Sequence, residues 1–370
     1  VGQFGTLYDQ LIATIALIIG LGSPSEALIG KVLLIAPAVA GALTAIPVYI
    51  VGKRLSGRLG GLLGATVLLL LPGTFLRRTL VGVADHNAVE PLVMMLAVAG
   101  FVIAFQKASE SMPIWEVVYE ELITEQQLDS LTDPLKWSLL AGFSLGIYIW
   151  TWPPAVFFIG IIGLFTLIKL TSDVLHEQTP EPTAFVVATS MLVVAFMSLI
   201  AIDRIQFDTV ALSLLQPLAA TVVALEAIGL SWLARQWEQR EIDTTLYPVA
   251  VGAIGTVGVG VTSILGLGIV GLVTNNLLGI AGFSATATAR TIGEAQPFVG
   301  QTAIRRSGGS IPGRIAVEYG FTFFSGVAAA FVLHAKPLLK RGTQRVYGYL
   351  LFSVSLIGVL FLVPSLLDFI

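Results

Sequence analysis

The segment 77–90 holds the side chains of this sequence that are best suited to do chemistry. Two arginines, two carboxylates, a histidine and an amide lie there between two long apolar runs. Asp85, His86 and Asn87 supply oxygen and nitrogen ligands at consecutive positions, and oxygens two residues apart can turn toward one hard cation such as Mg²⁺ or Mn²⁺. Asp85 can equally cap a helix that begins just after it. The residues alone leave both roles open.

The composition defines the elements that must position this segment. Of 370 residues, 55% are hydrophobic and 12% are charged, and the mean hydropathy is +0.89. These values indicate an all-α polytopic membrane protein, a multi-helix transmembrane bundle. The absence of cysteine removes disulfide, zinc-thiolate and Cys-nucleophile chemistry. The net charge of -3, without a large basic cluster, argues against a nucleic-acid partner.

We interpret ten apolar runs as membrane spans, with a basic turn at 52–58 between the first two. The runs are Ala27–Val51, Leu59–Phe75, Ala88–Phe105, Trp137–Trp150, Ala155–Leu170, Ala184–Ile202, Thr209–Ala234, Pro248–Val273, Ile315–Ala335 and Val346–Val363. The earlier run Leu11–Leu21 is too short to cross a ~30 Å hydrocarbon core. We therefore expect residues 1–26 to form the end of an external loop with an interfacial helix.

The loop charges predict the orientation of the chain. Alternation of the spans places all the loop lysines on one side, which the positive-inside rule makes cytoplasmic. The opposite side carries the arginines Arg77, Arg78, Arg204, Arg290, Arg305, Arg306 and Arg314. Guanidinium groups there suit an anionic partner with phosphate or carboxylate. Alternatively, they pair with Asp85, Glu294 and Glu318 or with the phosphates of membrane lipids.

Two long polar segments interrupt the spans. Residues 107–136 form an acidic insertion that we expect to be cytoplasmic and solvated. Residues 274–312 form an external loop in which Glu294 is the only carboxylate. On this topology Glu294 and Asp85 face the same extracytoplasmic compartment, so they can share one site.

Several short motifs resemble those of archaeal oligosaccharyltransferase catalytic subunits of the AglB type. Thr291-Ile292-Gly293-Glu294 resembles the family's Thr-Ile-x-Glu motif, and Val83-Ala84-Asp85-His86-Asn87 resembles its second short acidic motif, usually Asp-His-His. The segments 41–49, 71–75 and 150–154 are also similar to the family, and the acidic insertion is most similar to haloarchaeal members. The resemblance runs from Phe4 to the end of the chain and implies a membrane domain of the GT-C glycosyltransferase type.

The resemblance also implies an activity, a cofactor and a set of site residues. The activity is transfer of an oligosaccharide from a lipid-linked donor, a dolichyl phosphate or pyrophosphate, to asparagine in Asn-x-Ser/Thr of an acceptor polypeptide. Asp85, Asn87 and Glu294 are expected to hold a catalytic Mn²⁺ or Mg²⁺, although Asn87 stands where relatives carry His or a carboxylate. Catalysis is assigned to Glu294, Asp85 and Arg78. Substrate binding is assigned to Arg78, Glu294, Arg290 and His86.

Some expected features lie outside the sequence, and two other functions stay open. The family's first acidic motif is expected before Val1, and its carboxy-terminal soluble domain after Ile370, so we expect an inactive part of the membrane domain. One alternative is another polyprenyl-phosphate-dependent membrane glycosyltransferase. The other is a secondary transporter that uses Glu226 or Lys31 inside the membrane. Against the transporter, the polar residues cluster in the loops of one face.

Overall fold

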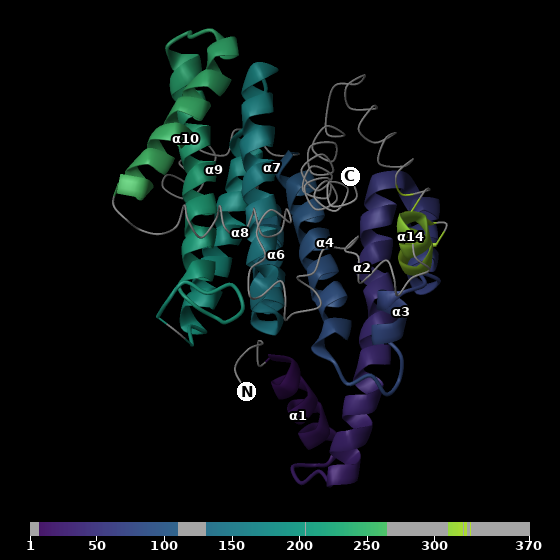
Figure 1. The fold of residues 1–370 in the computed structure, drawn as a ribbon. Helices are drawn as coiled ribbons and strands as arrows, with labels where there is room; N and C mark the ends of the chain where they lie inside the picture. Colours follow the sequence, from purple (N-terminus) through teal and green to yellow (C-terminus); the bar gives the residue numbers. More distant parts are fainter. Residues whose placement is uncertain are drawn as a thin grey trace. The chain divides into compact units, whose positions relative to one another are not determined.

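The computed structural model describes residues 7–109, 131–203, 205–264 and 310–320, together with Thr322, Phe323 and Gly326 (Figure 1). Every regular element within these residues is helical, which confirms the predicted all-α class. Glu294, Arg290, residues 110–130 of the acidic insertion and most of the loop 274–312 lie outside them.

Contacts divide the chain into two units. Residues 1–173 and 178–233 form the first, and residues 174–177 and 234–370 form the second. The first unit contains the segment 77–90.

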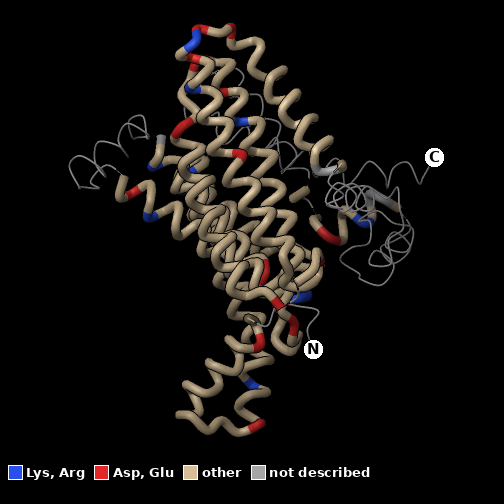
Figure 2. Tube along the Cα trace, turned by 90° about the vertical axis from the view of Figure 1, so that its left-hand side faces the viewer, with Lys and Arg blue, Asp and Glu red and all other residues tan. Residues whose placement is uncertain are grey.

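Six helical segments of the described residues are long and apolar enough to cross a membrane. They are Glu26–Leu69, His86–Ala108, Pro153–Leu175, Glu181–Ile200, Leu215–Gln239 and Thr244–Val261. Figure 2 shows long uncharged stretches along these helices. The chain is therefore a multi-pass membrane protein, as predicted.

Helix α1 (Leu7–Ile19) precedes the first of these segments and has only 13 residues. This length agrees with the short apolar run Leu11–Leu21 of the sequence. The interfacial position of the helix stays a prediction. Ser25 then caps α2 (Glu26–Leu69), because its hydroxyl oxygen accepts a hydrogen bond from the backbone N–H of Leu28 at 3.3 Å.

Helix α2 consists of two helical stretches joined by a tight reversal. Ser56 and Gly57 leave the helical conformation, and Gly57 has a φ of 75°, which glycine adopts without a steric penalty. The stretches pack closely, since a Cβ on Gly61 would lie 2.7 Å from the carbonyl oxygen of Tyr49. This hairpin confirms the basic turn predicted at 52–58.

The second stretch of α2 ends earlier than the run Leu59–Phe75 predicts. The helix stops at Leu69, Pro72 and Gly73 follow, and Gly73 has a φ of 90°. A separate short helix, α3 (Thr74–Arg78), then begins. The prediction was wrong here because apolarity continues through Phe75, whereas proline and a positive-φ glycine end the helix.

Three helices form the centre of the first unit: α4 (Glu90–Ser109), α6 (Thr132–Thr151) and α8 (Glu181–Ile200). Helix α6 lies between the other two and approaches both through small residues. A Cβ on Gly100 of α4 would lie 2.9 Å from Cα of Ala141, and one on Gly142 would collide with the backbone of Ser190 in α8. The Ser190 hydroxyl also donates to the carbonyl of Ser138 at 2.9 Å. Such close backbone approach is typical of packing between membrane helices.

Polar contacts join the helices at the two ends of this bundle. At one end Arg54 Nη1 donates to Gln106 Oε1 at 2.9 Å, and Lys107 Nζ lies 3.6 Å from Asp133 Oδ2. At the other end Trp150 Nε1 donates to the carbonyl of Met197 at 3.0 Å. One end of the bundle therefore holds the basic turn and the two chain ends that flank the acidic insertion. The last residues of α6, before Pro153, lie at the opposite end.

Helices α7 (Val156–Leu175) and α9 (Leu215–Gln239) complete this part of the first unit. The short helix η3 (Pro153–Ala155) begins at two adjacent prolines and leads into α7. The rings of Phe105 in α4 and Phe165 in α7 lie 5.2 Å apart. A Cβ on Gly163 of α7 would lie 3.4 Å from Oε2 of Glu226. Glu226 thus faces the neighbouring helix α7.

The second unit contains η4 (Thr244–Leu246), α10 (Tyr247–Ile264) and α14 (Ile311–Tyr319). Ser310 caps α14, so this helix begins within the last residues of the predicted loop 274–312. Gly320, with a φ of 56°, follows the helix and interrupts the predicted span Ile315–Ala335. Arg314 Nη1 lies 2.7 Å from Glu318 Oε1. This ion pair supports, for Arg314, the alternative in which the external arginines pair within the protein.

Candidate active site

The candidate site is built on the chain between α3 and α4, which is fixed to α2 at two points. Thr79 follows α3 and packs at Gly41, where an added Cβ would lie 2.5 Å from its Cβ. Gly82, with a φ of 100°, donates its backbone N–H to the carbonyl of Leu34 at 3.0 Å. These anchors hold the backbone immediately before Asp85.

Asp85 caps the short helix η1 (His86–Ala88) and so has the structural role that the sequence left open. Its Oδ1 accepts from the backbone N–H of Asn87 at 3.2 Å, and its Oδ2 accepts from Nδ2 of the same residue at 2.7 Å. The Asp85 side chain remains 34% exposed. It is therefore held firmly but can still be reached by a ligand.

The electrostatic surroundings of Asp85 favour its ionised form. Burial raises the pKa of this carboxyl, but the hydrogen bonds from Asn87 and the positive charges of His86 and Arg78 outweigh burial. The net effect is a pKa below the ordinary value. Arg78 is the last residue of α3, so the end of this short helix places its charge near Asp85.

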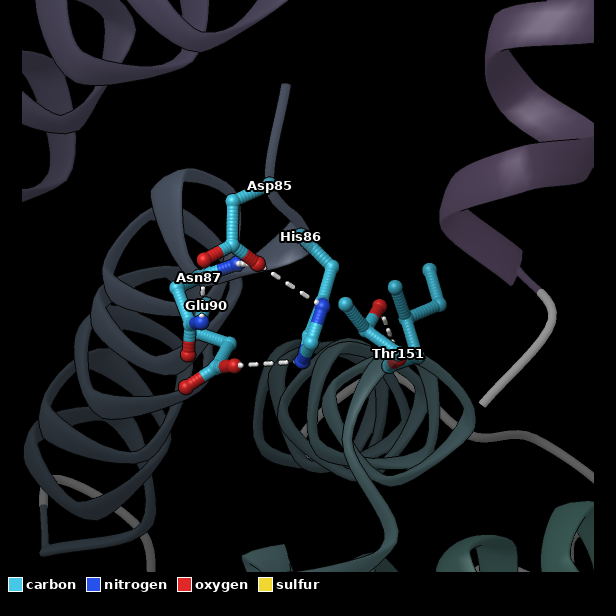
Figure 3. Close-up of polar contacts among 6 residues, drawn as sticks. Asp85, His86, Asn87, Glu90 and Thr151 are labelled. Carbon is cyan, nitrogen blue, oxygen red and sulfur yellow. Dashed lines mark hydrogen bonds and ion pairs between the residues drawn. The ribbon is translucent and has the colours of Figure 1, made fainter. Parts of the chain in front are cut away.

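His86 lies between two carboxylates, as Figure 3 shows. Its Nδ1 is 3.0 Å from Asp85 Oδ1, and its Nε2 is 3.3 Å from Glu90 Oε1. Glu90 is the first residue of α4. Glu90 is absent from the predicted site residues, although it follows a histidine by four residues, which is the spacing at which helical side chains meet.

Two further elements border the site. Helix α6, which ends at Thr151, packs against α4, and Figure 3 draws Thr151 in the same view as His86. Helix α1 packs against α6. There Tyr8 is 5% exposed, and among the described residues its hydroxyl has no hydrogen-bond partner. Burial and then the negative charge of Asp85 raise the pKa of Tyr8, so its hydroxyl lies in the field of that carboxylate.

The structure thus brings together Asp85, His86, Asn87 and Arg78 of the predicted site and adds Glu90. Glu294 and Arg290 lie outside the described residues. Within the part of the chain that the structure describes, no three His, Asp or Glu side chains converge on a metal position. The exposed Asp85 carboxylate fits a hard cation. Asn87 directs its nitrogen toward Asp85, so its amide must turn before its oxygen can serve as a ligand.

Sequence comparison identifies the family. A profile described as "Oligosaccharyl transferase STT3, N-terminal" matches residues 2–293. The chain belongs to the STT3 oligosaccharyltransferase family. It is also 50% identical, over 365 residues, to the dolichyl-monophosphooligosaccharide–protein glycotransferase AglB of Haloferax volcanii. That alignment covers 99% of this chain and 34% of the relative, so the chain spans about a third of the relative's length.

Solved structures of this STT3-type fold from Archaeoglobus fulgidus agree with the helical architecture. The oligosaccharyltransferase AglB in complex with an inhibitory peptide and a dolichol-phosphate superposes with a TM-score of 0.75 at 19% identity, covering 98% of this chain and 39% of that one. A form tethered to an acceptor peptide with the NVT sequon superposes with a TM-score of 0.71 at 21% identity, covering 97% of this chain and 38% of that one. A complex with Zn and sulfate superposes with a TM-score of 0.61 at 20% identity, covering 98% of this chain and 43% of that one.

Proposed function

We propose that this chain is part of the membrane domain of an archaeal oligosaccharyltransferase. The complete enzyme would transfer a glycan from a dolichyl-phosphate donor to asparagine in Asn-x-Ser/Thr of an acceptor polypeptide. The observation that carries the proposal is the 50% identity to Haloferax AglB over 99% of this chain, which includes the segment that holds Asp85. The name of that relative favours a monophosphate donor over a pyrophosphate.

The chemistry of the proposed reaction explains why it needs carboxylates. An amide nitrogen is a poor nucleophile because its lone pair is delocalised into the carbonyl. A carboxylate that accepts hydrogen bonds from both amide hydrogens weakens this conjugation, and we assign that role to Glu294. Asp85 would hold Mn²⁺ or Mg²⁺ with Asn87 and Glu294, and the cation would neutralise charge on the phosphate leaving group.

The remaining roles concern the donor and the orientation of the chain. Arg78 carries its charge next to Asp85, where a guanidinium suits a phosphate. We assign Arg290 and His86 to substrate binding, and we place these groups on the extracytoplasmic face of the cell membrane. The family membership removes the support for a secondary transporter.

The test compares Glu294→Gln with Asp85→Asn in the full-length protein. Glutamine keeps the volume of Glu294 but replaces one acceptor oxygen with an NH₂ group, so transfer should be abolished while donor binding stays near normal. Asp85→Asn should instead lower both the rate of transfer and the affinity for Mn²⁺, since a neutral oxygen holds a divalent cation less tightly.

The measurements are the initial rate against Mn²⁺ concentration and, separately, binding of the lipid donor. Glu26→Gln provides a matched control, because this carboxylate is exposed at the start of α2. Near-normal turnover by Glu294→Gln, or full rescue by added Mn²⁺, would contradict the assigned role of Glu294.

A further inference from the structure

The imidazole of His86 connects two elements of the candidate site. Its Nδ1 faces Asp85, which belongs to the segment before α4, and its Nε2 faces Glu90, the first residue of α4 itself. The nitrogen–oxygen distances of 3.0 and 3.3 Å place both carboxylates within ion-pair range of the imidazole. The ring therefore braces the segment that carries Asp85 against a helix of the bundle core.

Burial separates the roles of the two carboxylates. The Glu90 side chain is 14% exposed and that of His86 is 19%, whereas Asp85 reaches 34%. In Figure 3 the ring lies between the two acids. Asp85 is therefore the acid that is more open to a ligand, while Glu90 is the more buried of the two.

Such an arrangement matches the way proteins support a ligand carboxylate. Side chains that contact the ligand, and their own hydrogen-bond partners, fix its direction, and replacing one typically weakens metal binding 10- to 100-fold. His86 contacts Asp85 directly, and Glu90 fixes the far side of the His86 ring. Without Glu90 the ring could rotate away from Asp85, because its Nε2 would lose the carboxylate that it faces.

We infer that Glu90 is a positioning residue that acts through His86 to hold the Asp85 carboxylate in its orientation for a divalent cation. The inference rests on the proposed function, because it takes Asp85 as a cation ligand. Glu90 touches neither cation nor substrate in this arrangement.

The experiment measures Mn²⁺ affinity of the full-length protein by electron paramagnetic resonance, so its readout does not depend on turnover. The variants are Glu90→Gln, His86→Asn and the double substitution, with Glu26→Gln as the matched control for loss of one negative charge. We expect each single substitution at the site to weaken Mn²⁺ binding roughly 10-fold. The double variant should bind about as weakly as the weaker single one, because the two residues act in series.

A purely electrostatic or structural effect of Glu90 gives a different pattern. In that case Glu90→Gln would weaken Mn²⁺ binding by the same factor with or without His86, and the inference would be overturned. Unchanged affinity in Glu90→Gln would overturn it too. If Glu90→Gln does not fold, Glu90→Asp provides the test, since it keeps the charge but withdraws the carboxylate from Nε2. Weaker binding by that variant supports the inference, and unchanged binding overturns it.

Asp85→Asn separates failure of this inference from failure of the proposed function. If Asp85→Asn loses Mn²⁺ affinity and Glu90→Gln does not, only the positioning role is wrong. If Asp85→Asn leaves Mn²⁺ affinity unchanged, the proposed cation site itself is wrong.

Discussion

At the scale of single residues, Asn87 determines how Asp85 is held, and in the proposed cation site it would also affect how strongly the cation binds. Its backbone and side-chain nitrogens both donate to Asp85, and the residue is 8% exposed. These donors favour ionised Asp85, but a neutral amide oxygen is a weaker ligand for a hard cation than a carboxylate.

Asn87→Asp should therefore bind Mn²⁺ more tightly than the natural protein. The substitution removes the donor to Asp85 Oδ2 and sets two carboxylates side by side, which destabilises the protein without metal and favours the form with metal. We expect a higher Mn²⁺ affinity together with a lower melting temperature in EDTA. Asn87→Ala is the control and should lose affinity. Equal or weaker Mn²⁺ binding by Asn87→Asp would count against Asn87 as a ligand position.

Tyr8→Phe should stabilise the fold. Burying a hydroxyl that has no partner costs about 1–3 kcal/mol, and among the described residues the Tyr8 hydroxyl has none. Phenylalanine keeps the ring and removes this cost, so the melting temperature of the purified protein should rise by a few degrees. A lower melting temperature would mean that the hydroxyl has a polar partner.

The sequence identified part of this site for definite physical reasons. Asp85, His86 and Asn87 stand out because ionisable and amide groups are rare between apolar runs, and η1 keeps consecutive residues together. Glu90 was not assigned because the four-residue spacing from His86 brings the two side chains together only if the chain is helical from His86 onward. The direction of the Asn87 amide also follows from the local turn and could not be read from residue types.

At the scale of helices, close backbone contact determines how the bundle is assembled. Hydrophobic runs predicted most of the described helices. A backbone inside lipid must form its own hydrogen bonds, and a helix forms them within one segment. The runs predicted that the chain turns back at 52–58, but they could not predict that glycines bring the two stretches of α2 into contact, since glycine also occurs where nothing is near it. They also missed the break at Pro72 and Gly73, where the chain stays apolar while the backbone turns.

Gly142→Ala should destabilise the protein, because the added Cβ collides with the backbone of Ser190 and forces α6 and α8 apart. Overpacking of this kind typically costs about 1–3 kcal/mol. Gly160→Ala in α7 is the matched control, since its Cβ would meet nothing within 4 Å. Thermal unfolding in detergent should show a lower midpoint for Gly142→Ala alone. Equal midpoints for the two variants would be evidence against this close approach.

At the scale of the whole molecule, the arrangement of loops predicts which residues share a compartment. The polar contacts of Arg54, Gln106, Lys107 and Asp133 lie near the end of α4, whereas Asp85 lies just before the start of that helix. The alternation of the spans predicts that Glu294 lies on the same membrane face as Asp85.

Cysteines at Val81 and Ser284 should both react with an impermeant thiol reagent in intact cells. Cysteine at Ser56, in the reversal of α2, should react only after permeabilisation. The sequence contains no cysteine, so each label reports one position. Labelling of Val81→Cys without Ser284→Cys would show that Asp85 and Glu294 face different compartments.

The ion pair between Lys107 and Asp133 joins the two chain ends that flank residues 110–130. Its side chains are 33% and 58% exposed, so the pair contributes little. The packing of α4 against α6 is what holds those ends together. Because the free-energy cost of joining two fixed chain ends grows only slowly with the length of the connection, the bundle should tolerate an insertion between residues 109 and 131. A rigid marker domain could therefore be inserted between residues 109 and 131, where it would help to align single particles in electron microscopy.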